Sequence, residues 1–188
     1  MRRQAARSLG MIANPQAVAS LIHSLNSNDL RLQEAAILAL RSINDPACVP
    51  SLIEYLYGTS LQKPMEALIE ALAAFEIWEV AEVIKDYLND SSKRVQGAAG
   101  IYFYRMTRER KYLATINNNL SDQNAFLRQS AAFDLAQCHD AILSENITAA
   151  NLPNNVKMAA LKQILETHAS CINSGNSKNS ILDRVVKV

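Results

Sequence analysis

The side chains best suited to chemistry gather in the stretch YFYRMTRERKY, where arginines stand among tyrosines. Arg105 and Arg108 follow Tyr104, and Tyr112 comes shortly after them. Guanidinium groups bind carboxylates, and aromatic rings offer flat apolar faces. The stretch therefore favours a conjugated ligand that carries carboxylates, or a partner protein.

A second group of chemical side chains recurs one repeat apart. Glu54 and Tyr55 precede Asp86 and Tyr87 by 32 residues. A carboxylate accepts hydrogen bonds from ring N–H groups, and a tyrosine can stack on a planar ligand. The same residues would also suit an ordinary solvated helix face, so both interpretations stand at this point.

Nucleophiles and metal ligands are sparse. Cys48, Cys138 and Cys171 are widely spaced and match neither a disulfide framework nor a zinc motif. The sequence also has no phosphate-binding loop and no hydrolase elbow. We predict no bound metal and no permanent cofactor, and the sequence identifies no catalytic residue.

The elements that position these residues follow from an internal repeat. Residues 4–25 share nine of 22 positions with residues 35–56 without a gap. The frame continues through anchors spaced by 31, 32, 31 and 32 residues: Met1, Leu32, Pro64, Val95 and Leu127. Apolar residues at 0, 4, 8 and 11 positions from each anchor form one helical stripe, and a second stripe follows in each unit.

Each unit is therefore predicted to be a helical hairpin, with turns at Pro15 and Pro46 in the first two units. We predict an all-α fold: an α-solenoid with a right-handed superhelix, built from about five HEAT-like hairpins and a further terminal helix. Residues 1–169 form this solenoid, and residues 170–188 are expected to be a polar, flexible tail. Second helices of a solenoid commonly line its concave surface, so we expect the pairs at 54–55 and 86–87 to lie there.

The frame separates three consecutive aromatic residues. Phe103 falls in the same core slot as Leu9 and Leu40. Tyr102 falls beside that stripe, and Tyr104 falls roughly opposite it. Tyr102 is expected to pack with a satisfied hydroxyl and Tyr104 to lie on the surface, either singly or as part of a tyrosine surface for a ligand.

Charge and hydropathy exclude two classes of protein. Nineteen basic and eighteen acidic side chains give a net charge of +1, a poor match for a phosphate backbone. No stretch of 18 or more residues is apolar throughout, and the first residues do not resemble a secretory signal. We expect an intracellular protein without a membrane span or a nucleic-acid partner.

The repeat period and the segments LQEAAILALRSINDPACVPSLIEYL and FLRQSAAFDLAQ resemble the HEAT-like phycobilisome lyases of cyanobacteria. The stretch from YFYRM to QCHDA, with NVKMAALKQILE after it, resembles the F-type subunit of the heterodimeric E/F-type bilin lyases. The resemblance implies a cytoplasmic lyase subunit that is active only with an E-type partner. It implies thioether formation between a phycobiliprotein cysteine and phycocyanobilin or phycoerythrobilin. Two alternatives remain open: a non-catalytic phycobiliprotein binder and a generic HEAT scaffold.

Two surfaces are predicted on this basis. The bilin is expected to contact the tyrosines, carboxylates and arginines introduced above: Glu54, Tyr55, Asp86, Tyr87, Tyr104, Arg105, Arg108 and Tyr112. The partner is expected to cover the apolar side of the first helix, where no earlier hairpin shields it: Met1, Arg2, Ala5, Leu9 and Ile12.

Overall fold

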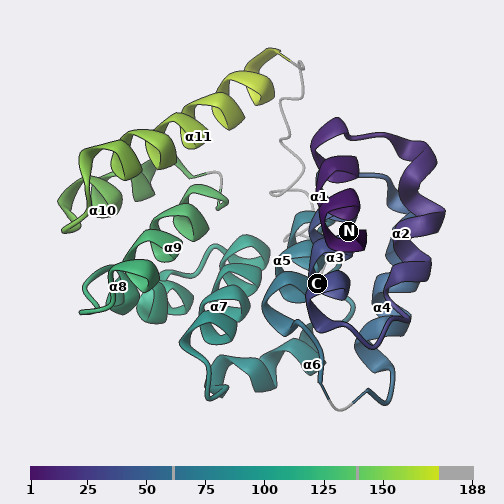
Figure 1. Cartoon of the computed structure of the whole chain (residues 1–188). Helices are drawn as coiled ribbons and strands as arrows, with labels where there is room; N and C mark the ends of the chain where they lie inside the picture. Colours follow the sequence, from purple (N-terminus) through teal and green to yellow (C-terminus); the bar gives the residue numbers. More distant parts are fainter. Residues whose placement is uncertain (61, 139, 174–188) are drawn as a thin grey trace, which may run out of the picture. The chain divides into compact units, whose positions relative to one another are not determined.

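The computed structural model describes residues 1–60, 62–138 and 140–173, and within them the chain forms helices and no strands (Figure 1). It divides into two compact units, Met1–Thr115 and Ile116–Val188. First and second helices alternate along the chain, and a final helix follows the fifth hairpin. The predicted all-α fold of about five HEAT-like hairpins plus a terminal helix is confirmed.

Unit 1 contains three complete hairpins and the first helix of a fourth. Its elements are α1 (Arg2–Ile12), η1 (Pro15–Ala17), α2 (Val18–Ser24), α3 (Leu30–Ile43), η2 (Pro46–Cys48), α4 (Val49–Tyr57), α5 (Met65–Ala74), α6 (Ala81–Lys85), η3 (Asp86–Asn89), α7 (Lys93–Thr107) and η4 (Arg110–Leu113). The first helices α1, α3, α5 and α7 pack in sequence against one another and form one layer. The second helices form another layer.

Unit 2 holds the remaining helices. They are α8 (Ala114–Leu120, whose first two residues belong to unit 1), α9 (Ala125–Ala136), η5 (Ala141–Leu143), α10 (Ser144–Ala149) and α11 (Asn154–Asn173). Helices α9, α10 and α11 pack on one another. The predicted tail was to begin at residue 170, but α11 continues to Asn173, and residues 174–188 lie outside the described residues.

The hairpin turns form as the prolines predict. Pro15 and Pro46 each open a short 3-10 helix. The side chains of Asn14 and Asp45 accept hydrogen bonds from the backbone N–H groups of Gln16 (3.0 Å) and Ala47 (2.9 Å). These caps satisfy donors that a helix start leaves without a partner.

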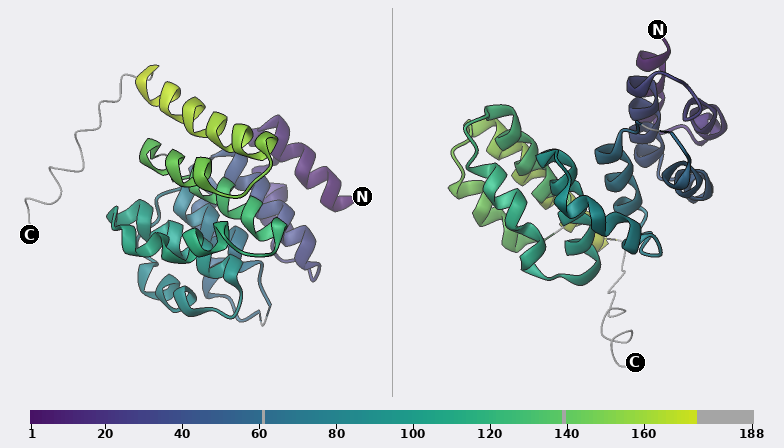
Figure 2. Two further views of the ribbon diagram at one scale, coloured as in Figure 1. Left: turned by 90° about the vertical axis from the view of Figure 1, so that its left-hand side faces the viewer. Right: turned by 90° about the horizontal axis from the view of Figure 1, so that it is seen from below.

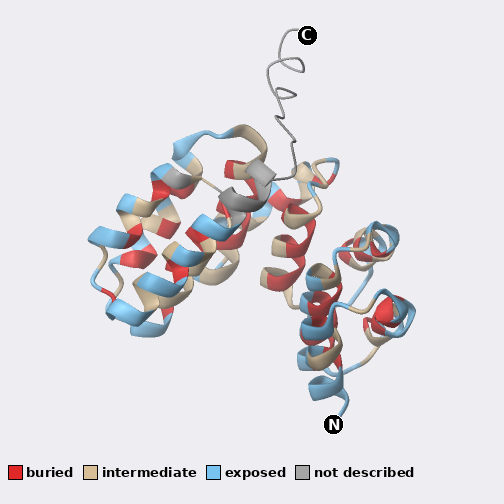
Figure 3. Cartoon of the chain, turned by 90° about the horizontal axis from the view of Figure 1, so that it is seen from above, coloured by how far each residue is buried: buried red, intermediate tan, exposed pale blue. Residues whose placement is uncertain are grey.

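The predicted stripe forms the core of the second repeat. Leu32, Ala36 and Leu40 on α3 are buried, as are Leu68 and Leu72 on α5. Figure 3 shows buried residues in red along the helices of each unit. The repeat frame is confirmed at these positions.

Adjacent first helices approach closely through small residues. A Cβ atom added at Gly10 would lie only 2.7 Å from the Cα of Ala39. Ala35, Ala67 and Ala71 are likewise buried on the same layer. Small residues at these contacts let neighbouring first helices lie close together, as on the inside of a bend.

Accordingly, within unit 1 the second helices lie on the outer side of the bent row of first helices (Figure 2). The expectation that second helices line a concave surface is wrong for this unit. Its physical reason is the run of glycine and alanine at first-helix contacts, which draws that layer together.

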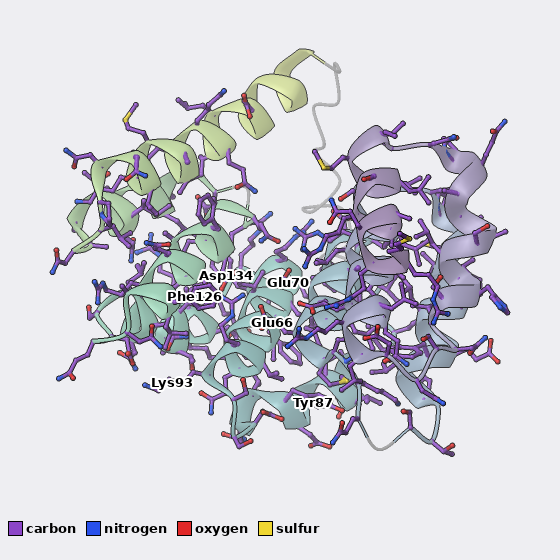
Figure 4. All side chains as sticks on the ribbon, in the orientation of Figure 1. Glu66, Glu70, Tyr87, Lys93, Phe126 and Asp134 are labelled. Atoms are coloured by element: carbon purple, nitrogen blue, oxygen red, sulfur yellow. The ribbon has the colours of Figure 1, made fainter. Side chains whose placement is uncertain are left out.

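Ion pairs link three successive first helices in unit 1. The guanidinium of Arg41 on α3 lies 2.5 Å from the carboxylate of Glu70 on α5. Arg94 on α7 pairs with Glu66, which lies one turn before Glu70 (Figure 4). Burial raises the pKa of Glu70, and the Arg41 guanidinium opposes that shift. The pairs tie α3 to α5 and α5 to α7.

Within the described residues, no helix is both long and apolar enough to cross a lipid bilayer.

Candidate functional site

The consecutive aromatic residues on α7 are all buried. The Tyr102 hydroxyl donates a hydrogen bond to the carbonyl oxygen of Ile77 at 2.5 Å. Its ring meets Trp78 edge to face, with centroids 5.1 Å apart. Burial raises the pKa of Tyr102. Tyr102 therefore packs with a satisfied hydroxyl, as predicted.

The prediction that Tyr104 lies on the surface is wrong, because its side chain is only 3% exposed. Tyr104 occupies the repeat slot of Gly10 and Arg41. In α1 and α3 that slot faces the next first helix, since Gly10 approaches Ala39 and Arg41 pairs with Glu70. A slot opposite the core stripe is thus a contact between repeats. No tyrosine surface forms at Tyr104.

The basic stretch after Tyr104 stays accessible. Arg108 is exposed, and its guanidinium carbon lies 5.8 Å from the centroid of the Tyr104 ring. Arg105 is half-buried. Tyr112 stacks on Phe103 with centroids 5.1 Å apart and an interplanar angle of 23°. The structure therefore gives this stretch two arginines beside a partly buried aromatic pair.

Asp86 and Tyr87 lie on η3, which packs against α7, as η4 does. Asp86 is exposed and Tyr87 is half-buried. Burial raises the pKa of Tyr87, and the Asp90 and Asp86 carboxylates add to the shift. Figure 4 labels Tyr87 beside the short helix pair α6–η3. These two residues and the basic stretch thus flank the same helix.

Glu54 and Tyr55 lie elsewhere, in a groove of about 550 Å³ between the ends of α2 and α4. The Tyr55 hydroxyl donates to Oε1 of the buried Gln33 at 2.7 Å. We call this feature the Gln33 groove. Asp86 and Tyr87 are not among its lining residues. The predicted ladder of two equivalent pairs therefore divides into two different settings.

Sequence reasoning missed the Gln33 groove. Gln33 directly follows the anchor Leu32, yet only 6% of it is exposed. Its Nε2 donates to the carbonyl oxygens of Leu25 (3.0 Å) and Ser27 (2.6 Å). The available signal was a glutamine beside a core anchor, where the third and fourth repeats have Met65 and Gln96.

The cysteines described here are poor nucleophiles. Cys48 is fully buried, and burial raises its pKa to about 11. Cys138 is also fully buried, with its thiol 3.8 Å from the carbonyl oxygen of Asp134. Both pack as small apolar residues. The side chain of Cys171 lies outside the described part of the chain.

The predicted partner surface on α1 is largely exposed. Met1, Arg2, Ala5 and Ile12 are accessible, and 71% of Ile12 is exposed. Leu9 is half-buried against the core. Helix α1 instead packs on α3 at Gly10, which approaches Ala39, and Ala6 on the same helix is also buried. The exposed side of α1 therefore carries an apolar strip (Met1, Ala5 and Ile12) bordered by basic residues, and we call this the outer side of α1.

Comparison with known proteins places the chain among bilin lyase subunits. A family model described as HEAT repeats matches residues 1–63. The chain is 41% identical to the bilin biosynthesis protein PecE of Nostoc sp. PCC 7120, over 97% of the chain and 72% of that protein. Identity to PecE of Mastigocladus laminosus is 46%, over 89% of the chain and 62% of that protein.

Subunit alpha of the phycocyanobilin lyase of Nostoc sp. PCC 7120 is 32% identical, over the whole chain and 71% of that protein. Among solved structures, the complex of CpcE and CpcF of phycocyanin lyase from the same organism matches with a TM-score of 0.78 and 32% identity. That match covers 87% of the chain and 66% of the solved one. The chain thus spans roughly two thirds of the length of these proteins.

These matches overturn the resemblance to the F-type subunit, because the relatives are PecE and subunit alpha and the matching solved chain is CpcE. The error has a physical reason. The stretch from YFYRM to QCHDA, on which that resemblance rested, includes the buried repeat positions Leu127, Ala131 and Leu135. Stacked HEAT-like helices fill such positions with similar residues in either subunit. The chain belongs to the family of E-type bilin lyase subunits represented by PecE and subunit alpha of phycocyanobilin lyase.

Proposed function

We propose that the chain acts as the E-type subunit of a two-subunit bilin lyase in the cytoplasm of a cyanobacterium. The observation that carries the proposal is the 41% identity to PecE along 97% of the chain. The solved relative occurs in a complex of CpcE and CpcF. The proposed partner is therefore an F-type subunit, in place of the E-type partner expected from the sequence.

The proposed reaction adds a phycobiliprotein cysteine to the ethylidene group of phycocyanobilin or phycoerythrobilin. One C–S bond forms, the thiol S–H bond breaks, and its proton ends on the adjacent ring carbon. The C=C bond becomes single, so the step needs no oxidant or reductant. Burial of Cys48, with its pKa near 11, supports a nucleophile that comes from the acceptor protein.

The proposed bilin contacts flank α7. Arg105 and Arg108 would bind the propionate carboxylates, and Tyr112 would offer an aromatic edge beside them. Asp86 would accept hydrogen bonds from pyrrole N–H groups, with Tyr87 next to it. Tyr104 is too buried for a direct contact.

Glu54 and Tyr55 are left out of the proposed bilin site. Among the described residues that line the Gln33 groove, Glu54 is the only charged one. The described lining residues therefore offer no cationic side chain to the two ionised propionates of a bilin.

Co-expression tests the function. The chain, an F-type subunit, a phycobiliprotein and a bilin-producing pathway are combined, and covalent colour on the acceptor is scored in a denaturing gel. Colour that needs both subunits would support the lyase. Bilin absorbance on the chain without covalent product would favour a binding protein. Absence of both signals would indicate a generic HEAT scaffold.

Variants test the site. Asp86→Asn and Arg108→Gln should each reduce covalent colour severalfold without unfolding the chain, because both side chains are exposed. Glu82→Gln is a matched control, since Glu82 is an exposed carboxylate on α6. Full bilin transfer by both Asp86→Asn and Arg108→Gln would remove Asp86 and Arg108 from the mechanism.

The partner surface is proposed to be the outer side of α1. Apolar Met1, Ala5 and Ile12 would form its centre, with Leu9 at its inner edge and Arg2 on the rim. Ile12→Lys should weaken co-purification with the F-type subunit, while Ser42→Lys, on the exposed side of α3, should not. Equal co-purification of both variants would place the partner elsewhere.

A further inference from the structure

The Gln33 groove has a polarity that the bilin proposal does not use. It lies within unit 1, between the loop after α2 and the loop after α4, and its volume of about 550 Å³ falls in the range of ligand sites. Ile22 and Leu25 contribute apolar wall, and Ser51 and Asn26 contribute small polar groups.

The floor of the groove presents hydrogen-bond acceptors. The Nε2 group of Gln33 donates to the carbonyl oxygens of Leu25 and Ser27, and its Oε1 accepts a hydrogen bond from the Tyr55 hydroxyl. Burial raises the pKa of Tyr55 to about 12, so the phenol keeps its proton and goes on donating to Gln33. The Tyr55 oxygen therefore offers only lone pairs to a ligand.

Two helix ends add negative potential. Helix α2 ends at Ser24 and α4 ends at Tyr57, and residues directly after each end line the groove. The C-terminal end of a helix carries partial negative charge. The Glu54 carboxylate adds a full one.

The structure already holds one cation at this edge. The ammonium of Lys63 lies 2.6 Å from the carbonyl oxygens of both Leu56 and Gly58, at the end of α4. It also lies 5.9 Å from the centroid of the Tyr55 ring. Lys63 is not among the residues that line the groove itself.

We propose that the Gln33 groove binds an arginine side chain presented by an extended segment of a partner protein. A guanidinium has five N–H donors and no acceptor, which matches a floor of acceptors. Its planar group can pair with Glu54 and stack on the Tyr55 ring. Serine and asparagine side chains at the walls can bond the backbone of the same segment. A carboxylate ligand would face Glu54 and the negative end of α2, while Lys63 already compensates the end of α4, so an acidic partner is disfavoured.

Peptide titration tests the proposal on the full chain. The probe is acetylated glycyl-arginyl-glycinamide, and the readout is the change in backbone amide NMR signals. The matched control peptide has citrulline in place of arginine, which keeps the shape and removes the charge. We expect saturable shifts at Ser51, Tyr55 and Gly58, and about tenfold weaker binding of the citrulline peptide, as for the loss of a charged hydrogen-bond partner.

A double-mutant cycle ties the effect to Glu54. Glu54→Gln should weaken the arginine peptide about tenfold and leave the citrulline peptide unchanged, so the two losses do not add. Glu34→Gln on α3 is the control, because Glu34 is exposed and lies outside the groove. Equal affinity for both peptides, no effect of Glu54→Gln, or shifts confined to other residues would each overturn the proposal. No bilin is present, so the result is independent of the lyase proposal.

Discussion

Replacement of Gly10 by alanine tests the close contact between α1 and α3. In an isolated helix this change should stabilise by up to about 1 kcal/mol, since glycine has the greater conformational freedom when unfolded. Here the new Cβ would lie 2.7 Å from the Cα and 2.9 Å from the Cβ of Ala39. Neither atom can move without its helix, because both belong to or adjoin the backbone.

Overpacking of this kind costs about 1–3 kcal/mol. The cost exceeds the propensity gain, and we expect Gly10→Ala to lower the free energy of unfolding by about 1 kcal/mol, with a larger loss for Gly10→Val. Urea unfolding followed by circular dichroism at 222 nm gives the comparison. Gln4→Ala on the same helix is the control, because Gln4 is exposed and should change little.

A stable Gly10→Ala protein would refute the reasoning. If its unfolding midpoint equals or exceeds that of the unmodified chain, then α1 and α3 are not packed as closely as the structure has them. The assignment of this slot to contacts between repeats would then fail as well.

Three further outcomes follow from burial in unit 1. Leu40→Ala should lower the free energy of unfolding by about 2–5 kcal/mol, whereas Leu38→Ala, at 36% exposure, should cost far less; equal losses in urea unfolding would contradict the repeat frame. Tyr102→Phe should cost about 1–2 kcal/mol, because the Ile77 carbonyl loses its donor; an unchanged midpoint would mean that water replaces the hydroxyl. Cys48, in a chain whose other cysteines are alanine, should resist a thiol reagent at pH 8 until urea unfolds the protein, and rapid labelling would show that the thiol is accessible. Because the folded-state pKa of Cys48 is raised, its contribution to stability is present below the unfolded pKa and is lost as the pH rises toward 11.

The fold was predictable because the same types of side chain recur at the same positions of successive repeats. Leu32, Ala36 and Leu40 fill slots that recur along the chain, and burial follows those slots in α3 and α5. The prolines that start second helices were readable for the same reason. The third and fourth repeats have no proline at that point, yet their first helices also stop there, α5 at Ala74 and α7 at Thr107.

The site was less predictable because it depends on how neighbouring repeats within unit 1 stack. Tyr104 was expected at the surface from one helix alone, but in α1 and α3 the same slot faces the next first helix, and only the spacing between helices reveals this. The Gln33 groove depends on two loops that meet across a repeat boundary. The subunit type was missed because the matching residues describe the repeat and carry little that distinguishes one subunit from the other.

Each first helix of unit 1 is followed, within one or two residues, by a residue in a left-handed backbone conformation. Positive φ angles of 53°, 57°, 57° and 62° occur at Ala13, Asn44, Glu76 and Arg108, at intervals of 31, 32 and 32 residues. The four side chains differ in type, so the turn inside each hairpin persists in the backbone where the sequence no longer marks it. A segment cut at two such points begins and ends in the same local geometry. Whole repeats can therefore be removed, duplicated or exchanged at these residues without a change of register, which makes them the natural joints for building solenoids of other lengths from this chain.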